Sequence, residues 1–94
     1  MIKTTLENGI VVETLDLDEN QHKAAVKAIE NDLRCIDGYK IKEVDNETLE
    51  IWREDAENEG DDFSGEFYQR AIDNDAEVYT LEDDIQPIGD IIVY

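Results

Sequence analysis

Residues 2–15 read IKTTLENGIVVETL, and this stretch gives the first prediction about the fold. Two runs rich in β-branched residues, 2–6 and 10–15, flank Glu7-Asn8-Gly9. Asn and Gly both accept the positive φ of a type I′ turn, so Asn-Gly between such runs is typical of a β-hairpin. We therefore expect the chain to begin with two antiparallel strands.

The residues after this hairpin predict a helix. Asp18 is a candidate N-cap, and Gln21 three positions later completes a capping box. Apolar residues then recur at steps of three and four in one stripe, namely Val26, Ile29, Leu33 and Ile36. Gly38 is the candidate C-cap, so this helix is expected to continue almost to residue 38.

A second hairpin is expected next. YKIKEV (39–44) and TLEIWR (48–53) are separated by a turn at Asp45. Strand alternation would place Leu49 and Ile51 on the same face.

The last third of the chain predicts a loop, a helix and two strands. The acidic residues 54–62 are expected to form the loop, and residues of roughly 62–73 the helix. The helix is suggested by the spacing of Phe63, Phe67 and Ala71. Closing strands are expected over 77–81 and 91–94. Pro87 and Gly89 mark a turn region between them.

These elements predict an α+β fold in one domain, residues 1–94. An antiparallel sheet built from two hairpins plus the C-terminal strands would carry two helices, packed on one face. The two units share the order hairpin then helix, and their helices end in AIEND (28–32) and AIDND (71–75). This similarity suggests an internal ββα repeat.

Negative charge dominates the composition and is concentrated in the second half. The chain has 26 acidic and eight basic residues, a net charge of −18. Residues 1–47 hold 11 acids and six bases, whereas residues 48–94 hold 15 acids and two bases. Membranes and nucleic acids are anionic and are therefore not expected as direct partners. A basic protein surface is the expected partner.

The sequence also bears on location. Cys35 is the only cysteine, which excludes an intramolecular disulfide and favours a reducing compartment. The N-terminus lacks the pattern of a secretory signal, and no apolar run approaches the ~20 residues of a membrane span. A cytoplasmic protein is expected, in a state of oligomerisation that the sequence leaves open.

The acidic segment matches the spacing of one metal-site motif. Positions 1, 3, 5, 6 and 12 of an EF-hand loop correspond to Asp55, Glu57, Glu59, Gly60 and Glu66. The residue types depart from that loop, because Glu replaces the shorter Asp or Asn at two positions and Asp62 occupies a normally apolar one. We expect no specific metal site, and a calcium-responsive module remains an alternative.

No catalytic signature is present. The only histidine and the only cysteine, His22 and Cys35, would lie roughly 20 Å apart if both were on the first helix. His22 is expected at the surface and Cys35 partly buried. The chain is therefore not expected to be an enzyme or to need a cofactor.

Rows of carboxylates on regular elements can imitate nucleic acid. Carboxylates at i and i+2 of a strand lie ~6.7 Å apart, and those at i and i+3 or i+4 of a helix ~5–6 Å apart. Duplex DNA presents one charge per ~3.4 Å along each strand, which is a comparable scale. The predicted partner-binding residues are Glu54, Asp55, Glu57, Glu59, Asp61, Asp62, Glu66, Asp73, Asp75, Glu77, Glu82, Asp83, Asp84 and Asp90. Candidate apolar anchors among them are Trp52, Tyr68 and Tyr79.

In size, acidity and α+β make-up the chain resembles the small DNA-mimic inhibitors that phages and mobile elements make against restriction or CRISPR nucleases. The resemblance implies a non-enzymatic inhibitor that occupies the basic groove of a nucleic-acid-binding protein. The resemblance involves no shared sequence motif, so it assigns no functional role to individual residues. Acidic immunity proteins against nuclease toxins are similar for the same electrostatic reason, and an acidic protein-interaction module is a further alternative.

Overall fold

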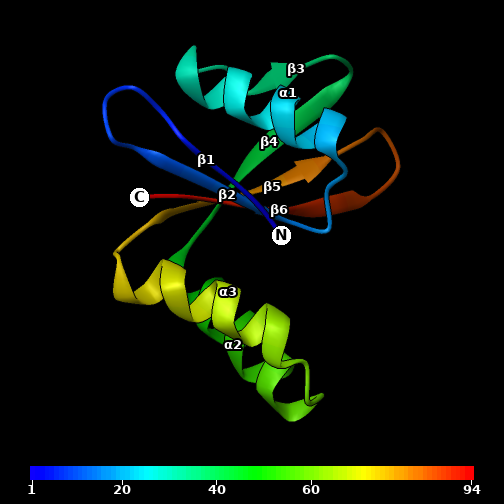
Figure 1. Cartoon of the computed structure of the whole chain (residues 1–94). Coiled ribbons are helices and arrows are strands. Elements are labelled where there is room, and N and C mark those ends of the chain that lie inside the picture. The colour runs from blue at the N-terminus through cyan, green and yellow to red at the C-terminus, as the bar shows by residue number, and fades with distance from the viewer.

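Six strands form one antiparallel sheet in the computed structural model, which describes residues 1–94 (Figure 1). The strands are β1 (Ile2–Thr5), β2 (Val11–Leu15), β3 (Cys35–Ile36), β4 (Tyr39–Val44), β5 (Glu77–Glu82) and β6 (Pro87–Val93). Their order in the sheet is β1-β2-β6-β5-β4-β3. The C-terminal hairpin β5–β6 therefore occupies the centre of the sheet, between segments from the first half of the chain.

Three helices cover the sheet, and they do so on both faces. α1 (Glu19–Glu30) lies on one side, while α2 (Asn46–Asn58) and α3 (Asp62–Asp73) lie side by side on the other (Figure 1). The predicted α+β class is confirmed. The prediction that the helices share one face is wrong, because the sheet presents apolar side chains on both.

Each face has its own hydrophobic core. Val12, Ile91 and Leu81 pack with the alanines of α1. Leu15 and Ile92, which point to the other side, pack with residues of α2 and α3. Strand alternation explains the division, since neighbouring residues of β6 such as Ile91 and Ile92 face opposite ways.

The first hairpin and the start of α1 are as predicted. β1 and β2 pair across a turn in which Gly9 has φ +88°. Asn8 does not have a positive φ, so the turn itself is not the expected type I′. The Gln21 amide donates to the Asp18 carboxylate over 2.8 Å, and the Asp18 amide donates to the Gln21 side chain over 2.9 Å. The capping box is therefore complete.

The predicted end of this helix at Gly38 is wrong. α1 stops at Glu30, so Leu33 and Ile36 of the predicted apolar stripe lie outside it. Asp32 adopts φ +52°, and the amide of Leu33 donates back to the carbonyl of Ala28. This left-handed C-terminal motif closes the helix eight residues early.

The two similar pentapeptides AIEND and AIDND are repeated helix ends. Asn31 and Asn74 are the C-caps, and each side-chain amide donates to the carbonyl four residues earlier over 2.8 Å. The aspartates that follow, Asp32 and Asp75, both have positive φ. The order of two strands and a helix does occur twice, as β1–β2–α1 and β3–β4–α2, but not as predicted. The predicted second unit ended in AIDND, which lies at the end of α3 and not of the helix that follows β4.

That helix, α2, replaces the second strand of the predicted second hairpin. The carboxylate of Asp45 accepts a hydrogen bond from the Thr48 amide over 2.8 Å and so caps a helix where a turn was expected. Leu49 and Ala56 are buried and share one helical face, with Trp52 half-buried between them. Ile51, predicted to share a face with Leu49, is 54% exposed.

The acidic segment 54–62 is not the predicted loop. It comprises the last turn of α2, a three-residue turn at Glu59–Asp61 and the first residue of α3. Gly60 has φ +75°, the left-handed conformation that ends α2. The predicted helix 62–73 is confirmed, with Phe67 and Ala71 buried and Phe63 exposed.

The closing strands are confirmed, but the turn between them is shorter than expected. Pro87 and Gly89 belong to β6, and residues 83–86 make the connection. A side chain at Gly89 would collide with the carbonyl of Leu15 and the side chain of Leu17. Glycine is thus required here by the close approach of the chain and not by a turn.

Candidate functional site: an acidic helical hairpin

The helical hairpin, residues 46–73, gathers much of the negative charge. It carries ten acidic and two basic residues, a net charge of −8, and all ten acids are exposed. α1, on the other face of the sheet, carries two acids and two lysines. The helices on the two faces of the sheet therefore differ in charge, although the residues outside the hairpin also carry a net charge of −10, from 16 acids and six bases.

On α2 the acids form a stripe that faces away from the sheet. Glu47, Glu50, Glu54 and Glu57 follow one another at steps of three, four and three, which places them along one side of the helix. The buried residues Leu49 and Ala56 lie on the opposite side. Four carboxylates therefore line ~15 Å of helix axis.

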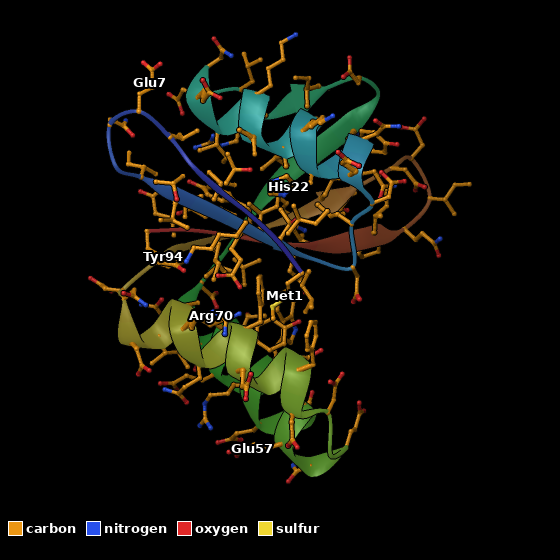
Figure 2. All side chains as sticks on the ribbon, viewed as in Figure 1. Met1, Glu7, His22, Glu57, Arg70 and Tyr94 are labelled. Atoms are coloured by element: carbon orange, nitrogen blue, oxygen red, sulfur yellow. The ribbon has the colours of Figure 1, made fainter.

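α3 carries a matching stripe. Asp62, Glu66 and Asp73 are exposed, opposite the buried Phe67 and Ala71. The two stripes adjoin at a groove of ≈ 280 Å³ lined by Arg53, Glu57, Asp61, Asp62, Gly65, Glu66 and Gln69. We call the combined surface the acidic face, made of Glu47, Glu50, Glu54, Glu57, Asp62, Glu66 and Asp73. Figure 2 shows Glu57 at the end of the hairpin remote from the sheet.

Little of this charge is neutralised within the molecule. Of the residues in the acidic face, only Glu57 has an ion pair, with Arg53 at 3.3 Å. Arg70, the other base of the hairpin, points toward the sheet (Figure 2). The acidic face is therefore available to cations from outside.

Aspartates at the helix starts fix the geometry of the hairpin. Asp61 caps α3 by accepting hydrogen bonds from the amide and the hydroxyl of Ser64, over 3.1 and 2.8 Å. These bonds hold the pKa of Asp61 below its usual value, and the Thr48 amide does the same for Asp45. Both carboxylates are thus structural as well as negative.

A partly buried ion pair joins the hairpin to the sheet. Glu13 of β2 is 3% exposed, and Arg70 of α3 donates to both of its carboxylate oxygens. Tyr94 donates a third hydrogen bond, over 3.0 Å, and Arg70 also contacts the sulfur of Met1 (Figure 2). The Glu13 carboxylate raises the pKa of Arg70. This arrangement joins α3 to β2 and to both ends of the chain.

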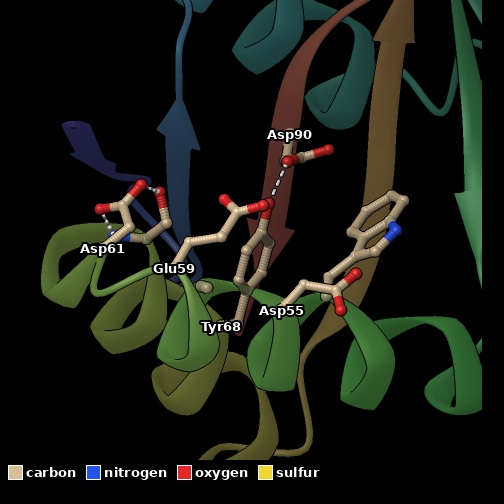
Figure 3. Close-up of a pocket in the computed structure, with 8 residues that line it drawn as sticks. Asp55, Glu59, Asp61, Tyr68 and Asp90 are labelled. Carbon is tan, nitrogen blue, oxygen red and sulfur yellow. Dashed lines mark hydrogen bonds between the residues drawn. The ribbon is translucent and has the colours of Figure 1, made fainter.

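A second polar contact joins the hairpin to β6. The Tyr68 hydroxyl donates to Asp90 over 2.6 Å at the base of a hollow of ≈ 220 Å³ (Figure 3). We call this the tyrosine hollow; its lining residues are Trp52, Asp55, Ala56, Glu59, Asp61, Ser64, Tyr68 and Asp90. Burial raises the pKa of both Asp90 and Tyr68.

The structure brings together eight of the fourteen residues predicted to bind a partner. These are Glu54, Asp55, Glu57, Glu59, Asp61, Asp62, Glu66 and Asp73, all in the hairpin. Asp75 lies two residues after the end of α3. Asp90 lies at the base of the tyrosine hollow, where its carboxylate accepts the hydrogen bond from Tyr68.

The other four predicted residues lie elsewhere. Glu77 accepts a hydrogen bond from Tyr79 on β5, whose ring packs in the core on the α1 side. Glu82, Asp83 and Asp84 lie at the β5–β6 turn, which Figure 1 shows well apart from the hairpin. Asp83 accepts the amides of Ile85 and Gln86, so its carboxylate also shapes that turn.

Sequence reasoning missed two residues of the acidic face, Glu47 and Glu50. These residues were assigned to the predicted turn and to the predicted strand 48–53, so their place on one side of a helix was not recognised. A signal was nevertheless present, since Asp45 is an N-cap residue and Leu49, Trp52 and Ala56 recur at steps of three and four.

The EF-hand alternative does not fit the structure. Residues 55–66 would have to form a single ion-wrapping loop, but they are the end of α2, a short turn and the start of α3. No group of three or more His, Cys, Asp or Glu side chains is arranged to hold a metal ion.

His22 and Cys35 are also placed differently from expectation. His22 is 3% exposed on α1, hydrogen-bonded through its two ring nitrogens to Thr4 and Thr14 over 2.8 and 2.7 Å. Cys35 lies not on the helix but on edge strand β3, where it is exposed.

None of the three helices has the length and apolar character that crossing a membrane requires. No protein-family model matches the sequence, and comparisons with curated proteins and with solved structures find no significant match.

Proposed function

We propose that this protein is a non-enzymatic inhibitor of a nucleic-acid-binding protein, such as a restriction or CRISPR nuclease, and that it acts as an acidic mimic of DNA or RNA. The acidic face is the surface that would occupy the partner's basic groove. The observation that carries the proposal is the alignment of exposed carboxylates, all but Glu57 without an ion pair, on the outer sides of two adjacent helices.

Spacing supports the mimicry. Neighbouring carboxylates at i and i+3 or i+4 of a helix are ~5–6 Å apart, on the scale of successive phosphates along a nucleic-acid strand. The four acids of α2 and the pair Asp62 and Glu66 of α3 have this spacing, whereas Asp73 lies two turns, ~10 Å, beyond Glu66. Together they present charges on a surface that a Lys/Arg-rich groove can contact.

The anchoring of the hairpin supports the proposal as well. Arg70 and Tyr68 link α3 to the adjacent strands β2 and β6, and Asp61 caps its start. A charge array held in one geometry loses less conformational entropy on binding than a flexible acidic tail. Opposite-charge steering would make association fast and sensitive to salt.

The test is capture of partners from bacterial lysate on the immobilised protein at about 50 mM and about 500 mM salt, the range over which nucleic-acid-type charge contacts weaken strongly. We expect enrichment of a basic nucleic-acid-binding protein at low salt, and loss of that protein when duplex DNA is added. The test variant carries Glu54→Gln, Glu57→Gln, Asp62→Asn and Glu66→Gln, four exposed acids outside the tyrosine hollow.

The matched control carries the same change of four charges on the rest of the molecule, at Glu7, Glu19, Glu30 and Glu43, which are also exposed. We expect the test variant to capture at least about fivefold less of the partner and the control variant to capture it nearly as well as the wild type. Equal capture by the two variants, or no basic nucleic-acid-binding protein among the captured species, would overturn the proposal.

A further inference from the structure

Two carboxylates reach from adjacent strands toward the helical hairpin. Glu13 is buried and Asp90 is half-buried, and the two differ in whether a cation accompanies them. Glu13 lies on β2 and Asp90 on the adjacent β6, both on the face covered by α2 and α3. Glu13 accepts a tyrosine hydroxyl, from Tyr94, and a guanidinium, from Arg70. Asp90 accepts a tyrosine hydroxyl, from Tyr68, but no cation.

The missing cation is conspicuous because the surroundings of Asp90 are negative. Asp55, Glu59 and Asp61 line the same hollow, and the lining includes neither lysine nor arginine. A carboxylate withdrawn from water is normally paired with a positive group. Burial and the nearby charge of Asp16 both raise the pKa of Asp90, as expected for a carboxylate that lacks such a group.

The walls of the hollow suit a planar cation. The rings of Trp52 and Tyr68 have centroids 5.9 Å apart and are inclined by 53°. Figure 3 shows Asp55 and Glu59 on either side of Tyr68, with Asp90 behind its hydroxyl. Aromatic faces attract cations, and guanidinium stacks on them while donating to carboxylates. The volume of ≈ 220 Å³ would hold roughly seven waters, or one side chain end.

We propose that the tyrosine hollow binds an arginine side chain of the basic partner. The guanidinium would complete at Asp90 the arrangement that Arg70 makes at Glu13, with Asp55 and Glu59 as further acceptors and Trp52 as a stacking surface. This inference rests on the proposed function for the origin of the arginine, and it adds a specific anchor to a surface that otherwise attracts by charge alone.

The experiment uses the isolated protein and three blocked tripeptides, Gly-Arg-Gly and its analogues with lysine or citrulline at the centre. Citrulline has nearly the shape of arginine without its charge. Trp52 is the only tryptophan, so its fluorescence and its indole N–H resonance report directly on the hollow. We expect saturable binding of the arginine peptide with a Kd on the order of 1 mM, weaker binding of the lysine peptide, and none of the citrulline peptide.

Three variants locate the site. Asp90→Asn and Glu59→Gln should each weaken binding of the arginine peptide by about fivefold or more, whereas Asp73→Asn, the same charge change on the acidic face, should change it less than about twofold. Glu59 is exposed, so its variant tests the hollow even if Asp90→Asn disturbs folding.

Each result of these measurements either supports or overturns the arginine site. Binding of citrulline as tight as that of arginine, no response of Trp52 to either cationic peptide, or equal weakening by Glu59→Gln and Asp73→Asn would overturn the hollow as an arginine site. Such a result leaves capture of a nucleic-acid-binding protein by the acidic face intact. Conversely, peptide binding with no capture from lysate would support the hollow and overturn the proposed inhibitor function.

Discussion

At the scale of single residues, buried polar groups connect the layers of this protein. His22 on α1 bridges Thr4 of β1 and Thr14 of β2, and Arg70 on α3 meets Glu13 of β2 from the other side. Every buried side-chain nitrogen and oxygen has a hydrogen-bond partner. Because an unpaired buried polar group costs about 1–3 kcal/mol, these contacts specify how the helices sit on the sheet.

The first prediction concerns the pH dependence that His22 imposes. Burial lowers the pKa of His22 below 6.5, so between that lowered value and pH 6.5 the unfolded chain binds a proton that the folded protein does not. The stabilising contribution is fully present above pH 6.5 and is lost as the pH falls. By pH 5.5 the wild type should lose up to about 1.4 kcal/mol of unfolding free energy relative to His22→Gln.

Urea unfolding at pH 7.5, 6.5 and 5.5 measures this difference. Comparison with His22→Gln is needed because acids titrate in both proteins, and Asp90, with its raised pKa, acts in the opposite direction by favouring the folded state as pH falls. Parallel pH profiles for the two proteins would contradict a buried neutral histidine.

At the scale of elements, α2 decides where the charge points. In a strand over 48–53, successive side chains would point to alternate faces of the sheet. In a helix, successive side chains are rotated by 100° about the axis, which places the acids opposite Leu49 and Ala56. The acidic face exists because α2 and α3 are both amphipathic in this sense, with apolar sides on the sheet and carboxylates outward.

The second prediction separates helix from strand at α2. Leu49 is 2% exposed and Ile51 is 54% exposed. Leu49→Ala should cost about 2–4 kcal/mol of unfolding free energy by leaving a cavity. Ile51→Ala should cost less than about 0.5 kcal/mol, because it loses little buried area and gains helix propensity.

Chemical denaturation of the two variants provides the measurement. Similar losses of unfolding free energy for both variants would indicate that the two side chains share a buried face, as in a strand. The acids of α2 would then not lie on one side of a helix, and the acidic face as described would be incorrect.

At the scale of the whole molecule, a net charge of −18 on 94 residues opposes folding. Only four ion pairs offset it, and one of these, between the half-buried Arg70 and the buried Glu13, holds the fold together. A net negative charge of this size is larger than solubility requires and lowers the stability of the fold. A binding function would explain why it is retained.

The third prediction follows from this repulsion. Raising the salt concentration from about 20 mM to about 500 mM should raise the melting temperature of the wild type, because the Debye length shortens and the like charges are screened. The variant with Glu54, Glu57, Asp62 and Glu66 neutralised should melt higher than the wild type at low salt and respond less to added salt. Thermal unfolding followed by circular dichroism tests both, and a wild-type melting temperature that falls with salt would contradict the interpretation.

Local signals in the sequence were sufficient for much of the fold. Asn8-Gly9 located the first hairpin, Asp18 and Gln21 the start of α1, and the spacing of Phe67 and Ala71 the helix α3. Each depends on interactions within a few residues, which are legible in the chain itself. The concentration of acids in the second half was equally visible, because charge needs no structure to be counted.

Tertiary structure decided the rest. The segment 48–53 fits both a strand and a helix, and its place opposite the sheet beside α3 selects the helix, since that arrangement buries Leu49 and Trp52 in a shared core. Arg70 and Glu13 are 57 positions apart in the chain, so no local sequence pattern predicts that they pair. Sequence alone therefore determined that this protein is an acidic α+β chain. Only long-range packing determined which carboxylates share a face and which one, Asp90, lies half-buried without a cation.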